Sequence, residues 1–185
     1  MIERLIVEHC APTLASLKTG NLFTYNFTGS RRIQDITSMN RYELAKKDLY
    51  MIILKQDEKS ALVYLFRYNS LKEDLSRKGV CEFLKSYGYK SNDIPYALCK
   101  LKERFKESDE FPHEIGLFLG YPLGDVYGFI KNKGKNCKCT GCWKVYCNRC
   151  EAEKKFKQFE KCRKVYRDLF VQGKSINRLA VSSKH

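Results

Sequence analysis

Residues 50–68 read YMIILKQDEKSALVYLFRY, and this stretch gives the strongest indication of the fold. Two runs rich in β-branched and aromatic side chains, 50–56 and 61–68, flank the polar tetrapeptide DEKS. Such runs favour extended backbone, and a short polar link between them is typical of a β-hairpin. The alternating segment NLFTYNF at 21–27 predicts another strand. We therefore expect a small, mostly antiparallel sheet.

Helices are expected to cover this sheet, because most other segments carry helical periodicity or helix-end signals. One short helix is predicted to begin near Pro12 and to stop at Gly20, since proline suits a first turn and glycine a left-handed end. The other predicted helices span residues 42–47, 70–88, 92–106, 112–119, 123–132 and 151–171. The sequence thus predicts a single α+β domain over 1–175, with a long basic C-terminal helix, and a polar tail at 176–185.

Positive charge is concentrated in the last third of the chain. The net charge is +14 over 185 residues, but residues 1–130 carry only +2 and residues 131–185 carry +12. A basic surface attracts polyanions, including nucleic acid, acidic proteins and phosphorylated cofactors. A solvated helix face that binds nothing is the alternative. The candidate binding residues on the last helix are Lys154, Lys157, Lys161, Lys164 and Arg167.

The amino-terminal segment and the apolar runs predict a cytoplasmic protein that does not enter a membrane. The segment MIERLIVEHCAP has two acidic residues and an apolar run too short for a signal peptide. The most apolar run, 115–130, is shorter than the roughly 20 residues that cross a bilayer. We therefore expect the nine cysteines to be reduced thiols, available for metal binding, thiol chemistry or burial.

Five of the nine cysteines lie in NCKCTGCWKVYCNRC at 136–150. Their spacing fits two kinds of metal site, a zinc held by four thiolates and a plant-type two-iron cluster. In the two-iron cluster, the last three cysteines would be ligands, with Cys137, Cys139 or Cys162 as the fourth. Both metal sites require WKVY at 143–146 to be a loop, whereas its composition favours a strand, which would turn the flanking sulfurs to opposite sides. Unligated cysteines are therefore favoured over a metal site. The candidate ligands of a four-thiolate zinc are Cys139, Cys142, Cys147 and Cys150.

The segment EHCAPT at 8–13 is a candidate for thiol chemistry. If a helix begins near Pro12, Cys10 lies at its amino end, where free backbone N–H groups stabilise a thiolate. His9 could reinforce this effect. Such a cysteine could be a nucleophile, a redox thiol or a ligand to iron or haem. The alternative is a small buried residue that fits the turn.

The segment FPHE at 111–114 supplies a candidate imidazole. His113 and Glu114 are expected in the first turn of a helix, where the backbone dipole favours the neutral imidazole of a ligand or general base. If the fold brings His113 to Cys10, they form a thiol–imidazole pair with Glu114 as its orienter. Otherwise His113 is a capping or packing residue.

Two glycine patterns are assigned structural roles. The tetrapeptide KTGN at 18–21 lacks the spaced upstream glycine of a phosphate-binding loop and is interpreted as a helix stop. Glycine recurs at every fourth position from Gly116 to Gly128, which predicts close packing of another segment against this region.

The segments FPHEIGLFLGYPLGDVYGFIKNKGKN at 111–136 and WKVY resemble a bacterial family catalogued as domain of unknown function 3793. The opening HCAPTLASLKTGNLF at 9–23 and the helix that ends in CRKVY at 162–166 are similar to it as well, so that the resemblance covers nearly the whole chain. It brings no established activity. It implies a redox or iron setting, because relatives are often encoded beside flavodoxin-like and iron-uptake genes. It also implies no essential metal at the cysteine cluster, since relatives commonly lack several of its cysteines.

Together these features predict a cytoplasmic redox- or iron-linked protein whose site combines Cys10, His9, His113 and Glu114. Iron, haem and zinc are the candidate cofactors, and a flavodoxin-like or other acidic protein is the candidate partner. The alternatives are a nucleic-acid-binding module that uses the basic helix and a zinc-stabilised interaction module. The sequence does not distinguish an enzyme from a carrier.

Overall fold

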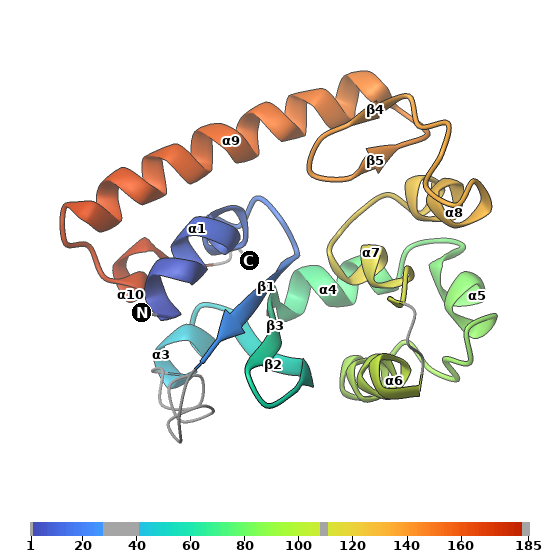
Figure 1. Ribbon diagram of the computed structural model, residues 1–185, viewed down its shortest axis with the longest axis horizontal. Helices are drawn as coiled ribbons and strands as arrows, with labels where there is room; N and C mark the ends of the chain where they lie inside the picture. Colours follow the sequence, from blue (N-terminus) through green and yellow to red (C-terminus); the bar gives the residue numbers. More distant parts are fainter. Residues whose placement is uncertain (1, 28–40, 108–110, 183–185) are drawn as a thin grey trace.

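The computed structural model describes residues 2–27, 41–107 and 111–182, and a three-stranded antiparallel sheet organises it (Figure 1). The predicted hairpin is confirmed, since β2 and β3 pair across a turn in which Asp57 Oδ1 accepts from the amides of Lys59 and Ser60, both at 2.7 Å. The predicted strand near 21–27 is confirmed as β1, which pairs with the other edge of β3. The strands are β1 (Gly20–Asn26), β2 (Leu49–Gln56) and β3 (Ser60–Arg67).

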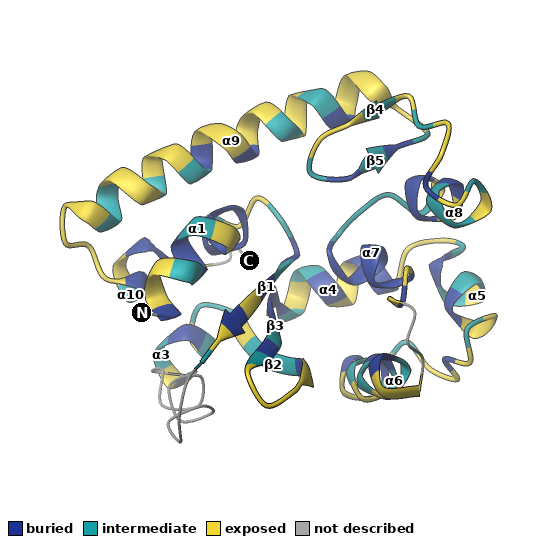
Figure 2. Cartoon of the chain, viewed as in Figure 1, coloured by how far each residue is buried: buried dark blue, intermediate teal, exposed yellow. Residues whose placement is uncertain are grey.

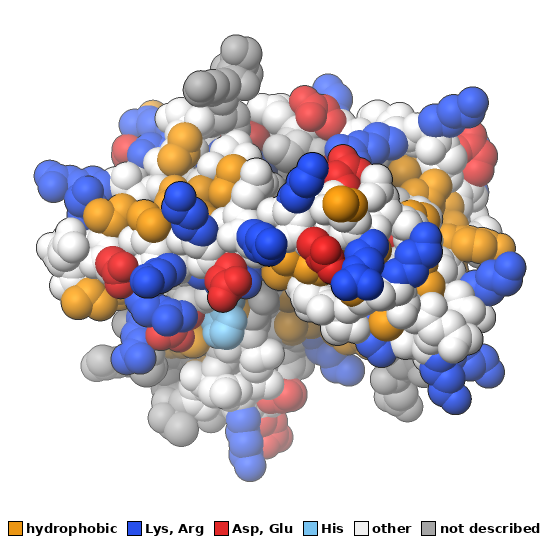
Figure 3. All heavy atoms as spheres, turned by 90° about the horizontal axis from the view of Figure 1, so that it is seen from above, with side chains coloured by type: hydrophobic (Ala, Val, Ile, Leu, Met, Phe, Trp, Pro, Cys, Tyr) orange, Lys and Arg blue, Asp and Glu red, His pale blue; other side chains and the backbone are white. Residues whose placement is uncertain are grey.

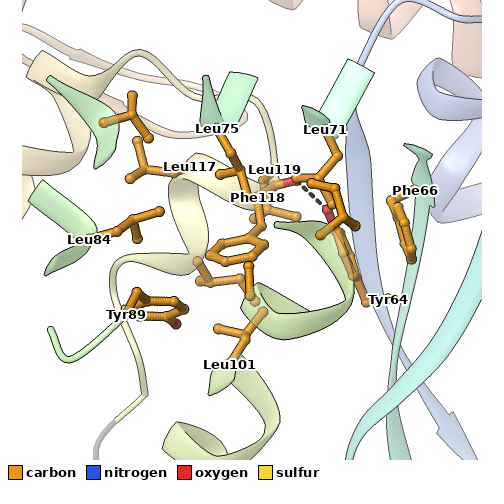
Figure 4. Close-up of a cluster of buried hydrophobic side chains, with 14 of the residues drawn as sticks. Tyr64, Phe66, Leu71, Leu75, Leu84, Tyr89, Leu101, Leu117, Phe118 and Leu119 are labelled. Carbon is orange, nitrogen blue, oxygen red and sulfur yellow. Dashed lines mark hydrogen bonds between the residues drawn. The ribbon is translucent and has the colours of Figure 1, made fainter. Parts of the chain in front are cut away.

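The central strand β3 is buried on both faces, because a helical layer covers each side of the sheet. Tyr64 and Phe66 belong to one hydrophobic core, whereas Val63 and Leu65 belong to the other. This alternation follows from the two-residue period of a strand. Figure 4 shows the first core, where the Tyr64 hydroxyl donates to the backbone oxygen of Phe118 and so ties the sheet to the helices.

The first helical layer lies C-terminal to β3 in the chain. The helix predicted over 92–106 is confirmed. The single helix predicted over 70–88 is wrong, because the chain divides into two helices before Gly79, whose φ of +83° is a left-handed conformation that interrupts a regular helix. The helices of this layer are α4 (Tyr68–Leu75), α5 (Val80–Lys85), α6 (Ile94–Glu107) and α7 (Ile115–Phe118).

The second layer combines the two ends of the chain. Helix α9 lies along α1, and its buried residues are on its inner side, while its outer side is exposed (Figure 2). The predicted start of the first helix near Pro12 is wrong, since Pro12 lies in the last turn of α1. Ile2, Ile6 and Cys10 recur at four-residue spacing on its buried side, and a proline so near the helix end removes only one internal hydrogen bond. The helices are α1 (Ile2–Leu14), α3 (Arg41–Ala45), α9 (Arg149–Val171) and α10 (Ile176–Leu179).

The polar tail predicted at 176–185 also requires correction. Its first residues form α10, and Ile176, Leu179 and Ala180 are buried in the core that α1 shares with the sheet. The amide of Val181 donates to Leu14 O at 3.0 Å. The domain therefore continues to this residue, because apolar side chains at this end of the chain complete its core.

A small hairpin of β4 (Cys139–Thr140) and β5 (Lys144–Val145) packs beside α8 (Leu123–Lys131) and the first half of α9. The strand that the composition of WKVY at 143–146 favours is confirmed only for the two residues of β5. The predicted close packing of the glycines is confirmed, but their neighbours are side chains. A Cβ on Gly124 would lie 2.3 Å from Cys147 Sγ, and one on Gly128 would lie 2.5 Å from the Tyr146 ring.

The whole is the predicted α+β domain, in which helices cover both faces of a small antiparallel sheet. No helix within the described ranges combines the length and the apolar character that crossing a membrane requires.

Candidate functional site

Cys10 is not at a helix amino terminus, contrary to the prediction. It lies well inside α1 and is 0% exposed among aliphatic side chains of the core. Burial raises the pKa of its thiol well above the ordinary value, because the thiolate would be desolvated. The neighbouring His9 is exposed on the surface of α1. A buried, protonated thiol is a poor nucleophile and a poor redox group.

His113 and Glu114 belong to a different part of the molecule. His113 precedes α7, and its ring packs edge-on against Phe129, with centroids 5.0 Å apart. Glu114 is buried and accepts from Arg104 Nε at 2.8 Å, so its carboxylate is engaged in an ion pair. Cys10 packs among α1, α10 and the sheet, whereas His113 lines a pocket beside α8. The structure therefore does not assemble the predicted thiol–imidazole pair.

The four cysteines proposed as zinc ligands have different neighbours. Both terminal nitrogens of Arg163 donate to Cys142 Sγ at 3.9 Å, whereas Cys147 Sγ packs on Gly124 of α8. Among the residues that the structure describes, no group of three or more histidine, cysteine or acidic side chains is arranged to hold a metal ion. The two sulfurs therefore contact different helices, Cys142 at α9 and Cys147 at α8.

The basic side chains predicted on the last helix lie on the outer side of α9. Figure 3 looks onto this face and shows Lys and Arg side chains spread along it, with a few acidic side chains between them. All five are exposed, and none forms an ion pair with a described residue. They are Lys154, Lys157, Lys161, Lys164 and Arg167.

The structure assembles a different group of functional side chains, which the sequence did not indicate. A cavity of about 430 Å³ opens where the α1–β1 connection, the tip of the β4–β5 hairpin and α9 meet. We call it the Lys18 pocket. Its polar lining comes from Lys18, Asn21, Cys142, Glu160 and Arg163, and the Tyr121 ring forms part of its wall.

Lys18 reaches this pocket from the turn that follows α1, where Ser16 adopts a left-handed φ of 59°. Its Nζ lies 5.0 Å from the centroid of the Tyr121 ring, and the side chain makes no hydrogen bond or ion pair with a described residue. Every fully buried side-chain nitrogen of the described residues has a partner, so this ammonium must reach the open space of the pocket. Burial is the main cause that lowers the pKa of Lys18 to about 8. The positive charge of Arg163 acts in the same direction, while the thiols of Cys142 and Cys10 oppose the shift.

Arg163 approaches the same pocket from α9 and also lacks a carboxylate partner among the described residues. It donates a weak pair of hydrogen bonds to Cys142 Sγ. Asn21 accepts from Thr13 Oγ1 at 2.8 Å, which fixes its amide group and leaves the NH₂ as a donor. The Tyr121 hydroxyl donates to Cys142 O at 3.2 Å and holds the hairpin tip against the pocket.

The signals for this site were present in the sequence but pointed elsewhere. Lys18 lies in the segment KTGN, which was interpreted as a helix stop, and Arg163 was one of many basic residues on the last helix. Three of the segments that resemble the family meet here: 9–23 contributes Lys18, 111–136 contributes Tyr121, and the helix that ends in CRKVY contributes Arg163. In the sequence, the available clue was that all three residues lie in segments that resemble the family.

Comparisons with known proteins agree with this resemblance. No curated protein and no solved structure matches the chain. The sequence model of one family, described as Protein of unknown function (DUF3793), matches residues 6–180, which is nearly the full length. The chain therefore belongs to the DUF3793 family.

Proposed function

We propose that the protein binds a small anion, such as a carboxylate or phosphate group, in the Lys18 pocket. One observation carries this proposal: two cationic side chains that repel each other face the same small pocket, and neither has a carboxylate partner among the described residues. Glu160 lies on the pocket lining, yet it is more than 4.0 Å from both cationic groups.

Electrostatics explains why this arrangement favours an anion. Taking an ammonium and a guanidinium out of bulk water costs free energy, and their mutual repulsion adds to that cost. An anion between them would offset both terms through charge-assisted hydrogen bonds, in which Asn21 could join as a neutral donor. Burial lowers the pKa of Lys18, whereas a nearby carboxylate would have raised it.

Removing either cation is expected to weaken anion binding strongly. Lys18→Met and Arg163→Gln should each reduce the affinity for acetate or inorganic phosphate by about tenfold to hundredfold, the loss of one charge-assisted hydrogen bond. Affinity should also fall as pH rises through about 8, because Lys18 is then neutral in the free protein. Isothermal titration calorimetry between pH 6.5 and 9.5 measures both effects.

Two variants serve as matched controls for this experiment. Lys161→Gln removes one charge from the exposed side of α9 and should change affinity by less than about twofold, since a surface charge is screened by salt. Lys18→Arg keeps its charge throughout the pH range, so its affinity should not fall near pH 8. Equal losses in Lys161→Gln and Arg163→Gln would contradict the proposal, because the effect would then report net charge alone.

The redox- or iron-linked role expected from the sequence stays a prediction. The pair of Cys10 and His113 cannot carry it, because the sulfur is enclosed in the core and the imidazole lies against Phe129. Cys142 is the cysteine that borders the Lys18 pocket. Any thiol chemistry of this protein should therefore be sought at Cys142 first.

A second candidate function, polyanion binding, is favoured by the basic side chains on the outer side of α9, which form no ion pair within the described part of the chain. If nucleic acid is the ligand, the affinity for a single-stranded oligonucleotide should fall steeply with salt, with a log–log slope that decreases by about 0.7 for each contacting lysine removed. Fluorescence anisotropy across a salt series measures this slope. A flat salt dependence, or equal effects of the two triple variants below, would exclude this function. The test variant replaces Lys157, Lys161 and Lys164 with glutamine, and the control replaces the exposed Lys72, Lys78 and Lys85.

A further inference from the structure

A second pocket adjoins the Lys18 pocket and is of opposite character. It has a volume of about 550 Å³ and lies between α7, α8 and the β4–β5 hairpin. We call it the aromatic pocket, because the rings of Phe111, Tyr121, Phe129 and Trp143 contribute to its lining, together with aliphatic side chains such as Val126. Cavities of this size and lining are typical of sites for small organic ligands.

The charged groups at the aromatic pocket are already engaged. Asp125 accepts from Trp143 Nε1 with one carboxylate oxygen and from the amides of Tyr146 and Cys147 with the other, all at 2.8 Å. Lys144 Nζ donates to Gly134 O at 2.8 Å. Apart from His113 and Thr140, the rest of the lining is ring faces, hydrocarbon and glycine backbone. A charged group would lose its hydration over most of this lining, so the pocket suits a mainly apolar body.

The two pockets share a thin wall. Tyr121 and Gly141 line both of them. On one side, the Tyr121 ring stacks on Trp143 with centroids 4.8 Å apart, and on the other its face receives the Lys18 ammonium at 5.0 Å. Gly141 has no side chain to rise between the pockets, and a Cβ there would lie 2.2 Å from the Phe156 ring. A ligand that passes over this wall would meet two cations at one end and aromatic rings at the other.

We propose that the ligand of the Lys18 pocket is an aromatic carboxylate, whose acid group lies between Lys18 and Arg163 and whose ring system fills the aromatic pocket. The inference rests on the proposed anion-binding function and specifies its ligand class. Aromatic walls prefer an aromatic body, because offset-stacked and edge-to-face ring contacts add to the gain from burying apolar surface.

A series of three probes tests this proposal: acetate, benzoate and 2-naphthoate. Each should bind, and affinity should rise with ring size, with 2-naphthoate binding about tenfold more tightly than benzoate because of its larger apolar surface. Trp143 is the single tryptophan of the chain and lines the aromatic pocket, so its emission reports on a ligand in contact with its ring. Calorimetry gives the affinities. The emission of Trp143 should change with the ring-bearing probes and not with acetate.

Two variants test the proposal by substitutions at exposed positions, where we expect little effect on folding. Thr140→Phe adds a ring at an exposed position on the pocket lining and should abolish the advantage of 2-naphthoate over acetate. Phe111→Ala removes a ring that is 48% exposed and should weaken 2-naphthoate binding several-fold without changing acetate binding. Either pattern supports the proposal if Arg163→Gln also weakens 2-naphthoate, as expected when acid and ring bind together.

Equal affinities for acetate and 2-naphthoate would overturn the aromatic-carboxylate assignment while leaving the anion-binding function intact. The assignment also fails if 2-naphthoate keeps its full affinity in Arg163→Gln, because the rings would then bind without the acid group. If neither acetate nor inorganic phosphate binds, the proposed function itself fails. The two failures are therefore distinguishable.

Discussion

Replacing Arg67 with methionine is expected to lower the free energy of unfolding by about 3–5 kcal/mol. Arg67 ends β3, is 0% exposed, and donates to main-chain oxygens of three segments that are distant in the chain. Two of the acceptors, Thr13 O at 2.7 Å and Leu14 O at 2.8 Å, belong to the last turn of α1, where carbonyls lack internal partners. The others are Lys47 O at 3.0 Å and Val181 O at 2.7 Å.

Methionine fits the space of the arginine stem but carries no donor, so all four carbonyls would lose the guanidinium. Thr13 O and Leu14 O would keep one backbone donor each, from Ser16 and Val181. An unsatisfied buried acceptor costs about 1–3 kcal/mol, and the C-terminal segment would lose its attachment to the sheet. Urea denaturation followed by circular dichroism measures the change. Arg178→Met is the matched control, because Arg178 is exposed on α10, and a surface change of this kind should stay within about 0.5 kcal/mol. A loss below about 1 kcal/mol for Arg67→Met would show that water replaces the guanidinium at little cost.

Arg67 also shows what sequence reasoning could not reach. The hairpin that ends with this residue was predictable, because β-branched and aromatic runs around a polar turn act over short distances in the chain. An arginine at the end of a strand, however, is normally interpreted as an exposed charge. Its burial depends on carbonyls supplied by α1, by the residues after α3 and by the C-terminal segment. Such convergence is a property of the tertiary structure.

The sequence does not predict the candidate site for a related reason. The start of α1, by contrast, is predictable from the sequence. The start of α1 was misplaced because Pro12 was given more weight than the apolar spacing of Ile2, Ile6 and Cys10, which is visible in the sequence. That error turned a buried thiol into a predicted nucleophile. Lys18 and Arg163, by contrast, are separated by most of the chain, and only the packing of α9 along α1 brings them together.

The second prediction concerns Asp125, which attaches the β4–β5 hairpin to α8. Asp125→Ala is expected to lower the free energy of unfolding by about 2–4 kcal/mol, because it leaves the Trp143 indole N–H and the amides of Tyr146 and Cys147 without their acceptor. Asp125→Asn should cost less. Its remaining oxygen can still accept from both backbone amides, while its NH₂ group would face the indole N–H, so that two donors oppose each other.

A double-mutant cycle isolates that conflict. Trp143→Phe removes the indole N–H, so Asp125→Asn should be less costly in the Trp143→Phe background than in the natural chain, by about 1–3 kcal/mol. Thermal and urea unfolding followed by far-ultraviolet circular dichroism give the four free energies. The same variants bear on ligand binding, since Trp143 is part of both the hairpin attachment and the aromatic pocket. Additive losses within about 0.5 kcal/mol would mean that Asp125 and the indole are not coupled, and that Asp125 attaches the hairpin through the amides of Tyr146 and Cys147 only.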